Sequence, residues 1–461
     1  MIRGTGLART RVLASPTVAP TPLPERPPFS LRARLLTPLA EGGTLHEADG
    51  LLVVDEGGRI AYAGAASGRT SEAEEALDLR GWVLLPGMVD LHAHLPQLPN
   101  AGLGAGLDLL TWLRAYVFPV ERDFSADVAE RAAPAAWRAF AAAGTTTALV
   151  YGAVFEASLD VAFQAAETHG LRVVLGKVMM DRLTYDETID PATILDRSLR
   201  ESIDLCSRWH MRDDGRLRYA FTPRFAVSCS MEMLRESAAA AASAGAYWQT
   251  HVSEDRGEIT EVARLFPDAL DYVDVYDRAG GLGERTVLAH AVHLSDRELS
   301  RLVETGTRVA HCPASNLFLA SGVMPLGRYL EAGLQVGLGS DVSAGPDLSI
   351  FAAMRVGFFS WNALRVEGRT TAAVPGPLRW LRMGTLDGAR ALGISDAVGS
   401  LEAGKEADVI AVDPSFTAPV PGDQDDAAED LMSRLIFRAH PDMVRAAWVR
   451  GRALAGPGMR S

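Results

Sequence analysis

The sequence is poor in lysine and has no cluster of positive charge. Its 461 residues include only two lysines, Lys177 and Lys405, and the formal net charge is −13. Nucleic acids and anionic membrane surfaces attract proteins through a concentrated positive field, which this acidic chain lacks. We therefore expect neither nucleic acid nor a membrane as a partner, and a small neutral substrate fits the composition better.

Cysteines and long apolar runs are also scarce. The three cysteines, Cys206, Cys229 and Cys312, are too few and too scattered for a disulfide framework, so a reducing cytoplasm is the expected location. No run of 18 apolar residues occurs, and no membrane span is predicted. Residues 1–28 are rich in Pro, Arg and Thr and are expected to form a disordered tail. A transit peptide is the alternative, which the prolines disfavour because they would break its amphipathic helix.

Two sequence patterns divide the rest of the chain. Residues 29–85 and 399–461 contain short strand-like segments separated by turn signals, which is typical of a β-rich domain. Between them, residues 86–398 contain eight apolar strand-like runs that alternate with helical stretches rich in Ala and Leu. This number of runs over roughly 300 residues matches a (β/α)8 barrel. We predict an α/β fold, namely a (β/α)8 TIM barrel with a small β-sandwich domain built from both chain ends.

Residues that commonly bind metals recur where the predicted barrel strands end. The first run ends in His92 and His94, the fifth contains His251, the sixth ends near His290, and Asp341 follows the eighth. Functional side chains of barrels lie at the carboxyl ends of the strands. Residues i and i+2 share one face of a strand, so His92 and His94 can bind the same ion, which His251 and Asp341 can help to enclose.

Three imidazoles and one carboxylate suit zinc or ferrous iron. A single His-x-His motif is weak evidence, because hydrogen-bonded core histidines also produce it. Here, however, ligand-type residues fall at the same end of four different strands. A structural core gives no reason for that, since an unpaired buried polar group costs about 1–3 kcal/mol. The sequence therefore predicts a catalytic metal site that keeps a position for water.

The sequence contains several longer characteristic blocks, which are LLPGMVDLHAHLPQ, TPRFAVSCS, QTHVSED, LAHAVHL, AHCPASNLFLASG and GLGSDVSAG. Together they resemble the amidohydrolase superfamily. Three more blocks, DLLTWLRAYVFPVERDF, GTTTALVYG and GKVMMDR, narrow the resemblance to the guanine deaminase family. The likeness runs from about Leu84 to Leu348, and GSLEAGKEADVIAVDP adds a match near the end. Four residues of the second set are expected to form a helix and a turn packed near the pocket, with the aromatic side chains in the core: Trp112, Tyr116, Phe118 and Glu121.

For the metal, the resemblance implies a single zinc bound by His92, His94, His251 and Asp341. This is the ligand set that the strand ends also indicate. Members of the superfamily with two metals use a carboxylated lysine, usually on the fourth strand, whereas Lys177 lies on the third. We therefore expect one zinc per chain, with ferrous iron as the less favoured ion.

For the reaction, the resemblance implies hydrolytic deamination of guanine to xanthine and ammonia in purine catabolism. Zinc would lower the pKa of the attacking water to about 7. Asp341 would accept the proton of that water, and His290 would hold or polarise it. Glu254 would protonate a ring nitrogen and then the leaving amino group.

For the substrate, the resemblance implies a planar slot formed by Gln97, Arg224 and Phe225, with His94 and Glu254 facing the bound base. Arg224 can donate to the purine carbonyl oxygen, Gln97 can donate and accept, and Phe225 can pack on the ring. The alternatives are a structural ion pair at the barrel rim for Arg224 and an ordinary core position for Phe225.

Two other functions are considered. One is a related hydrolase that deaminates another amino-heterocycle, such as a pterin, 8-oxoguanine or a triazine, and the pair Gln97 and Arg224 favours guanine over these. The other is an inactive barrel kept as an assembly scaffold, which the complete ligand set disfavours. The resemblance also suggests a homodimer. The chain departs from the family in Ser340, where threonine is usual, and in lacking the Gly-Asp-Asp that commonly precedes the last strand.

Overall fold

The computed structural model describes residues 22–184, 189–418 and 427–455. Most of the expected tail, residues 1–21, lies outside the described residues. Pro24 and Glu25, which belong to the described end of the expected tail, pack against a small sheet built from the two ends of the chain. The carbonyl oxygen of Pro24 accepts a hydrogen bond from Trp448 Nε1 at 2.8 Å, and that of Glu25 accepts one from the backbone N–H of Ala453 at 3.0 Å.

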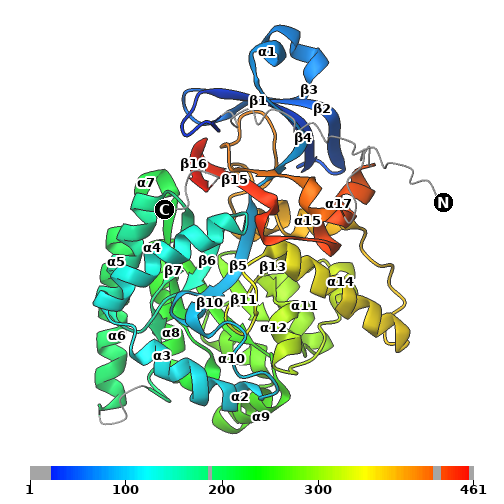
Figure 1. Cartoon of the computed structure of the whole chain (residues 1–461). Helices are drawn as coiled ribbons and strands as arrows, with labels where there is room; N and C mark the ends of the chain where they lie inside the picture. The colour runs from blue at the N-terminus through cyan, green and yellow to red at the C-terminus, as the bar shows by residue number, and fades with distance from the viewer. Residues whose placement is uncertain (1–21, 185–188, 419–426, 456–461) are drawn as a thin grey trace, which may run out of the picture.

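Eight parallel strands form a nearly closed barrel, in the order β5-β6-β7-β9-β10-β11-β12-β13 (Figure 1). Hydrogen bonds from Asp341 N to the carbonyl of His92 (2.7 Å) and from His94 N to that of Val342 (3.0 Å) join the first strand to the segment after the last. The predicted barrel is confirmed, and each predicted run supplies one of its eight strands. The strands are β5 (Met88–His94), β6 (Thr145–Tyr151), β7 (Arg172–Gly176), β9 (Leu217–Pro223), β10 (Tyr247–Val252), β11 (Thr286–His290), β12 (Arg308–His311) and β13 (Gln335–Leu338), with the short β8 (Val178–Met179) paired to β9.

Burial explains why these strands appear in the sequence as continuous apolar runs. Every residue of β5, β6, β7, β10 and β11 is buried, as expected for parallel strands whose outer face is covered by helices. The helices are α1 (Thr70–Glu75), α2 (Leu109–Trp112), α3 (Phe118–Arg122), α4 (Ala126–Ala142), α5 (Glu156–His169), α6 (Pro191–Trp209), α7 (Arg212–Gly215), α8 (Met231–Ala244), α9 (Arg256–Leu265), α10 (Tyr272–Arg278), α11 (Asp296–Thr305), α12 (Pro313–Phe318), α13 (Leu326–Glu331), α14 (Ile350–Val366), α15 (Pro377–Met383), α16 (Leu386–Ala391) and α17 (Ala428–Phe437). A π-helical turn, η3 (Leu113–Val117), joins α2 to α3.

The two ends of the chain build a second sheet of seven strands, in the order β16-β15-β14-β4-β1-β2-β3. The part predicted as a small sandwich is this single mixed sheet, in which β4 pairs antiparallel with β14 and parallel with β1. Its strands are β1 (Phe29–Pro38), β2 (Thr44–Val54), β3 (Ile60–Ala65), β4 (Leu77–Pro86), β14 (Val409–Val412), β15 (Val444–Val449) and β16 (Arg452–Ala455).

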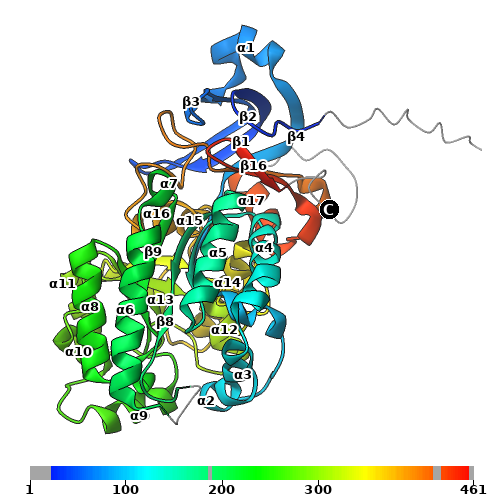
Figure 2. The same ribbon diagram turned by 90° about the vertical axis from the view of Figure 1, so that its left-hand side faces the viewer.

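The small sheet lies at one end of the barrel, and α2, α3 and α9 lie at the opposite end (Figures 1 and 2). A buried ion pair joins the sheet region to the barrel, since Arg172 Nε at the start of β7 donates to Asp408 Oδ2 at 3.0 Å. Arg172 also pairs with Glu406. Within the three described ranges, no helix is both long and apolar enough to cross a bilayer.

Candidate metal centre and substrate pocket

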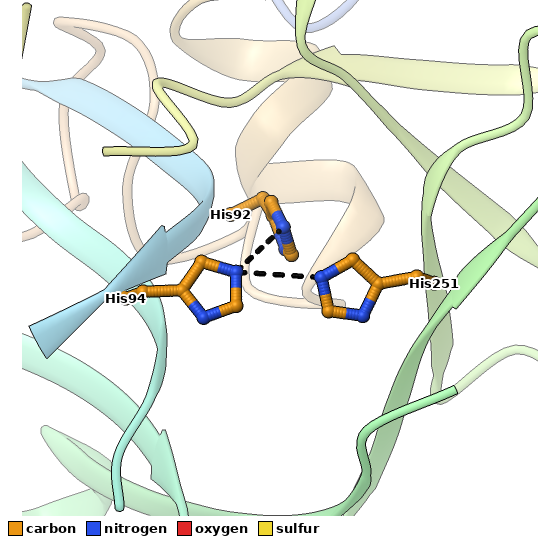
Figure 3. Close-up of side chains that lie close together, drawn as sticks. All are labelled: His92, His94 and His251. Atoms are coloured by element: carbon orange, nitrogen blue, oxygen red, sulfur yellow. Dashed lines mark hydrogen bonds between the residues drawn. The ribbon is translucent and has the colours of Figure 1, made fainter. Parts of the chain in front are cut away.

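Three imidazoles meet near the carboxyl ends of β5 and β10 (Figure 3). His92 and His94 are two residues apart on β5 and therefore project from the same face of the strand, and His251 comes from β10. His94 Nε2 lies 3.3 Å from His92 Nε2 and 3.3 Å from His251 Nε2. All three histidines are buried, and at most 9% of the surface of each residue is exposed.

Asp341, in the segment after β13, adds a carboxylate to this cluster. Its Oδ1 lies 3.2 Å from His92 Nε2 and 3.3 Å from His94 Nε2, and its Oδ2 lies 3.8 Å from His290 Nε2 at the end of β11. The ligand atoms of His92, His94 and His251 lie within 4.8 Å of one another, as do those of His92, His290 and Asp341. The structure thus brings all four predicted metal ligands together, with His290 beside them.

The donor chemistry of the cluster fits a bound cation. Burial lowers the pKa of His92 to about 4 and that of His251 well below its usual value, so both imidazoles are neutral at pH 7. His251 Nδ1 lies 2.6 Å from the carbonyl oxygen of Arg224, which can only accept. The His251 proton therefore sits on Nδ1, and Nε2 directs a lone pair at the cluster. A divalent metal binds where the lone pairs of several imidazoles and a carboxylate point at one position.

Two carboxyl groups of the site have opposite pKa shifts. Burial acts to raise the pKa of Asp341, but the neighbouring imidazoles of His92 and His94 outweigh it and hold that pKa well below its usual value. Burial raises the pKa of Glu254 well above its usual value, and the negative charge of Asp341 adds to this effect. Asp341 is therefore held in its ionised form, which can accept a proton, and Glu254 keeps its protonated form, which can donate one, to higher pH than an ordinary glutamate.

Glu254 follows β10 and contacts two residues of the site. Its Oε2 lies 3.3 Å from His290 Nε2, and its Oε1 accepts a hydrogen bond from Ser321 Oγ at 3.2 Å. His290 Nδ1 lies 2.9 Å from Asn316 Oδ1, which orients the imidazole. Sequence reasoning did not single out Ser321 or Asn316, although both lie in the block AHCPASNLFLASG that carried the resemblance.

A buried carboxylate that sequence reasoning missed, Asp90, connects the two segments that bear His92 and Asp341. It accepts hydrogen bonds from His92 N (3.1 Å), Ser340 N (2.9 Å) and Ser340 Oγ (2.5 Å). Burial raises its pKa to about 7. The Ser340 hydroxyl supplies the bond that a threonine hydroxyl can also make, so this departure from the family pattern keeps the contact. The signal in the sequence that could have identified Asp90 was an acidic residue inside the apolar run, two positions before His92.

Eight of the nine predicted site residues line one pocket, which also has an apolar wall. His92 is the exception, and its Nε2 contacts the pocket residues His94 and Asp341. Trp112, expected in the core, is 2% exposed and also lines the pocket. The eight are His94, Gln97, Arg224, Phe225, His251, Glu254, His290 and Asp341, and the apolar wall contains Leu109, Trp112, Leu113, Leu319 and Ala344.

Glu121 connects two of the predicted substrate-binding residues. Its Oε1 accepts a hydrogen bond from Gln97 Nε2 at 2.6 Å, and its Oε2 pairs with Arg224 Nη1. Ser343 Oγ donates to Gln97 Oε1 at 3.4 Å, and the Arg224 guanidinium carbon lies 5.3 Å from the centroid of the Phe118 ring. Arg224 thus takes part in an ion pair, the alternative weighed for it, but this pair is buried and Arg224 also lines the pocket.

Lys177 lies away from the histidine cluster. It follows β7, and its Nζ lies 2.9 Å from Ser198 Oγ and 3.2 Å from Glu201 Oε2. It lines a different pocket from the one beside the histidines. The expectation of one metal per chain stays a prediction.

Comparisons with known proteins identify relatives that match most of the chain. Residues 83–454 match the model of the amidohydrolase family. A probable guanine deaminase of Deinococcus radiodurans is 39% identical over 414 residues, which cover 87% of this chain and 92% of the relative. The structure of a guanine deaminase from C. acetobutylicum with bound guanine in the active site matches with a TM-score of 0.85 and 26% identity, over 93% of this chain and 100% of that one. An adenosine deaminase from Xanthomonas campestris with bound zinc matches with a TM-score of 0.76 and 26% identity, over 94% and 93%. The chain therefore belongs to the amidohydrolase family, in which its relatives include guanine deaminases.

Proposed function

We propose that this protein is a guanine deaminase that hydrolyses guanine to xanthine and ammonia in purine catabolism. The observation that carries the proposal is the cluster of three imidazoles and a carboxylate beside a pocket lined by Gln97, Arg224 and Glu254. Similarity to guanine deaminases over almost the whole chain supports the choice of substrate.

We further propose one zinc per chain, bound by His92, His94, His251 and Asp341. When bound there, zinc supplies a water molecule with a pKa of about 7, which is a nucleophile at neutral pH. Three nitrogen ligands and one oxygen ligand suit zinc and also ferrous iron, which is the less favoured ion. The zinc in a structural relative supports zinc.

The side chains around this site provide the proton transfers. Asp341, which its low pKa keeps ionised, accepts a proton from the attacking water at Oδ2. We assign a proton to His290 Nδ1, which lies 2.9 Å from Asn316 Oδ1, and His290 Nε2 then accepts a hydrogen bond from that water. Glu254, whose pKa is high, gives its proton to guanine N3 while the water oxygen bonds to C2. Glu254 then takes the proton held by Asp341 and passes it to the amino group, the C2–N bond breaks, and ammonia leaves. The C2 hydroxyl gives its proton to Glu254 as the carbonyl of xanthine forms, so both carboxyl groups return to their starting states.

The far side of the pocket, formed by Arg224, Gln97 and Phe225, recognises the edge and the face of the base that do not react. Arg224 donates to the carbonyl oxygen O6, and Gln97 Oε1 accepts from the adjacent ring N–H, N1–H. Phe225, which is 3% exposed and lies 6.4 Å from the His251 ring between centroids, packs on the purine face. The pocket therefore has a polar group for O6, for N1–H and, in Glu254, for N3 of guanine.

The test is whether the purified, metal-loaded protein releases ammonia and xanthine from guanine in equal amounts. Ammonia is measured with a coupled dehydrogenase assay and xanthine by ultraviolet absorbance. A pterin, 8-oxoguanine and an amino-triazine form the comparison panel. Faster turnover of one of these would assign the related activity instead, and metal-loaded protein that releases no ammonia from any of them would support an inactive scaffold.

We also propose a cytoplasmic homodimer. The three cysteines are free and buried, which fits a reducing compartment. The dimer rests on the family resemblance. Light scattering on the purified protein would measure its mass in solution, and fractionation of source cells would test its location.

A further inference from the structure

We infer that Glu121 is a positioning residue that fixes the hydrogen-bonding polarity of the substrate pocket, so that the pocket selects a purine with a ring N–H beside a carbonyl over one with a bare ring nitrogen beside an amino group. This inference rests on the proposed function and deepens it. Glu121 is fully buried and is not among the residues that line the pocket, so it acts through its neighbours.

The first step concerns the orientation of the Gln97 amide. A side-chain amide can turn by 180° and exchange its oxygen and nitrogen. An ionised carboxylate accepts hydrogen bonds and donates none, so the Gln97 NH2 group must face Glu121 Oε1, 2.6 Å away. The reverse orientation would place two acceptor oxygens against each other. Gln97 Oε1 is therefore held on the other side of the amide, where Ser343 Oγ donates to it at 3.4 Å.

The second step concerns Arg224, which pairs with the other oxygen of the same carboxylate. The side chains of Arg224 and Glu121 are 3% and 0% exposed. A single buried carboxylate thus holds the two polar groups that line the far side of the pocket. Gln97 is fixed with its acceptor available and Arg224 supplies donors, so the pair matches a neighbouring N–H and C=O on one edge of a ring.

Guanine and 2,6-diaminopurine differ on this edge and share the reacting amine. Guanine has a donor at N1 and an acceptor at O6, whereas 2,6-diaminopurine has an acceptor at N1 and a donor amine at C6. The amino group at C2 is the same in both. The ratio of kcat/KM for the two bases, compared between variants, therefore reports the polarity of the far side of the pocket and cancels their intrinsic reactivity.

The experiment measures this ratio in the metal-loaded wild type, in Glu121→Gln and in Glu121→Asp. Glu121→Gln provides both a donor and an acceptor, so Gln97 can turn either way, and we expect the preference for guanine to fall by about tenfold or more. Glu121→Asp keeps an acceptor-only group, and we expect it to retain most of the preference even if both rates fall. A purely structural role for Glu121 would lower both rates equally. An unchanged ratio in Glu121→Gln, or an equal loss of preference in Glu121→Asp, overturns the inference.

Gln97→Leu gives a second route to the same answer, because it leaves the ion pair between Glu121 and Arg224 intact. If Glu121→Gln does not fold, Gln97→Leu should still lower the preference for guanine by a similar factor, and an unchanged preference there refutes the inference. The proposed function fails separately, when wild type releases no ammonia from guanine. Wild-type turnover of guanine with an unchanged ratio in the variants refutes only the role of Glu121.

Discussion

Replacing Glu254 by glutamine tests the proposed proton transfer directly. The side chain is buried, at 3% exposure, and its two oxygens contact His290 and Ser321. Glutamine has nearly the same shape and fills the same space, but an amide cannot deliver a proton to N3. General acid–base groups contribute about 100- to 10,000-fold to rates. At about 1.36 kcal/mol for each factor of ten, this corresponds to about 2.7–5.4 kcal/mol in the activation free energy.

We therefore expect Glu254→Gln to lose at least about 100-fold in kcat for ammonia release from guanine. Its zinc content, measured by elemental analysis, should equal that of the wild type, because Glu254 is not one of the four proposed ligands. Ser321→Ala is the matched control, since it removes only the hydrogen bond to Oε1 and should cost about tenfold or less. A Glu254→Gln protein with normal turnover would remove this residue from the mechanism.

Three further predictions concern the metal and the stability of the fold. Dialysis against a chelator should abolish ammonia release, and titration with zinc should restore it at one equivalent per chain; a requirement for two would contradict a single-metal site. Asp90→Ala leaves the backbone N–H groups of His92 and Ser340 without their acceptor and should destabilise the fold by about 1–3 kcal/mol in a urea titration, so an unchanged midpoint would argue against this connection. Arg172→Met leaves the Asp408 carboxylate buried without the guanidinium that pairs with it, and should lower the free energy of unfolding by about 3–5 kcal/mol in the same urea titration. At urea concentrations below the unfolding transition, kcat should not change. A loss of activity without a loss of stability would contradict this structural role.

The barrel and the convergence of the four proposed metal ligands could be predicted from the sequence because local patterns specify both. Parallel strands covered on both faces give uninterrupted apolar runs, and each predicted run contains one strand of the barrel. The convergence of His92, His94, His251 and Asp341, the proposed ligands, could be predicted because strand direction places them at the same end of the barrel.

The contacts of Glu121 and Asp90 could not be predicted in the same way. Glu121 lies on α3, and its partners come from the segments after β5 and β9, so only the packing of three separate elements brings them together. In the sequence, Glu121 follows several aromatic residues, and this pattern predicted only a helix packed on the core. The strand order of the small sheet is equally non-local, because β4 and β14 come from opposite ends of the chain.

The hydrogen bond from Asp341 N to the carbonyl of His92 joins the two ends of the barrel at the place where the proposed ligands meet. During synthesis on the ribosome, the two histidines of β5 emerge early, and Asp341 emerges only after the seven later strands. For most of its synthesis, the nascent chain therefore has imidazoles but not the carboxylate of Asp341. The set of four proposed ligands is complete only at the end. The four proposed ligands therefore come together only when the barrel closes, late in the synthesis of the chain.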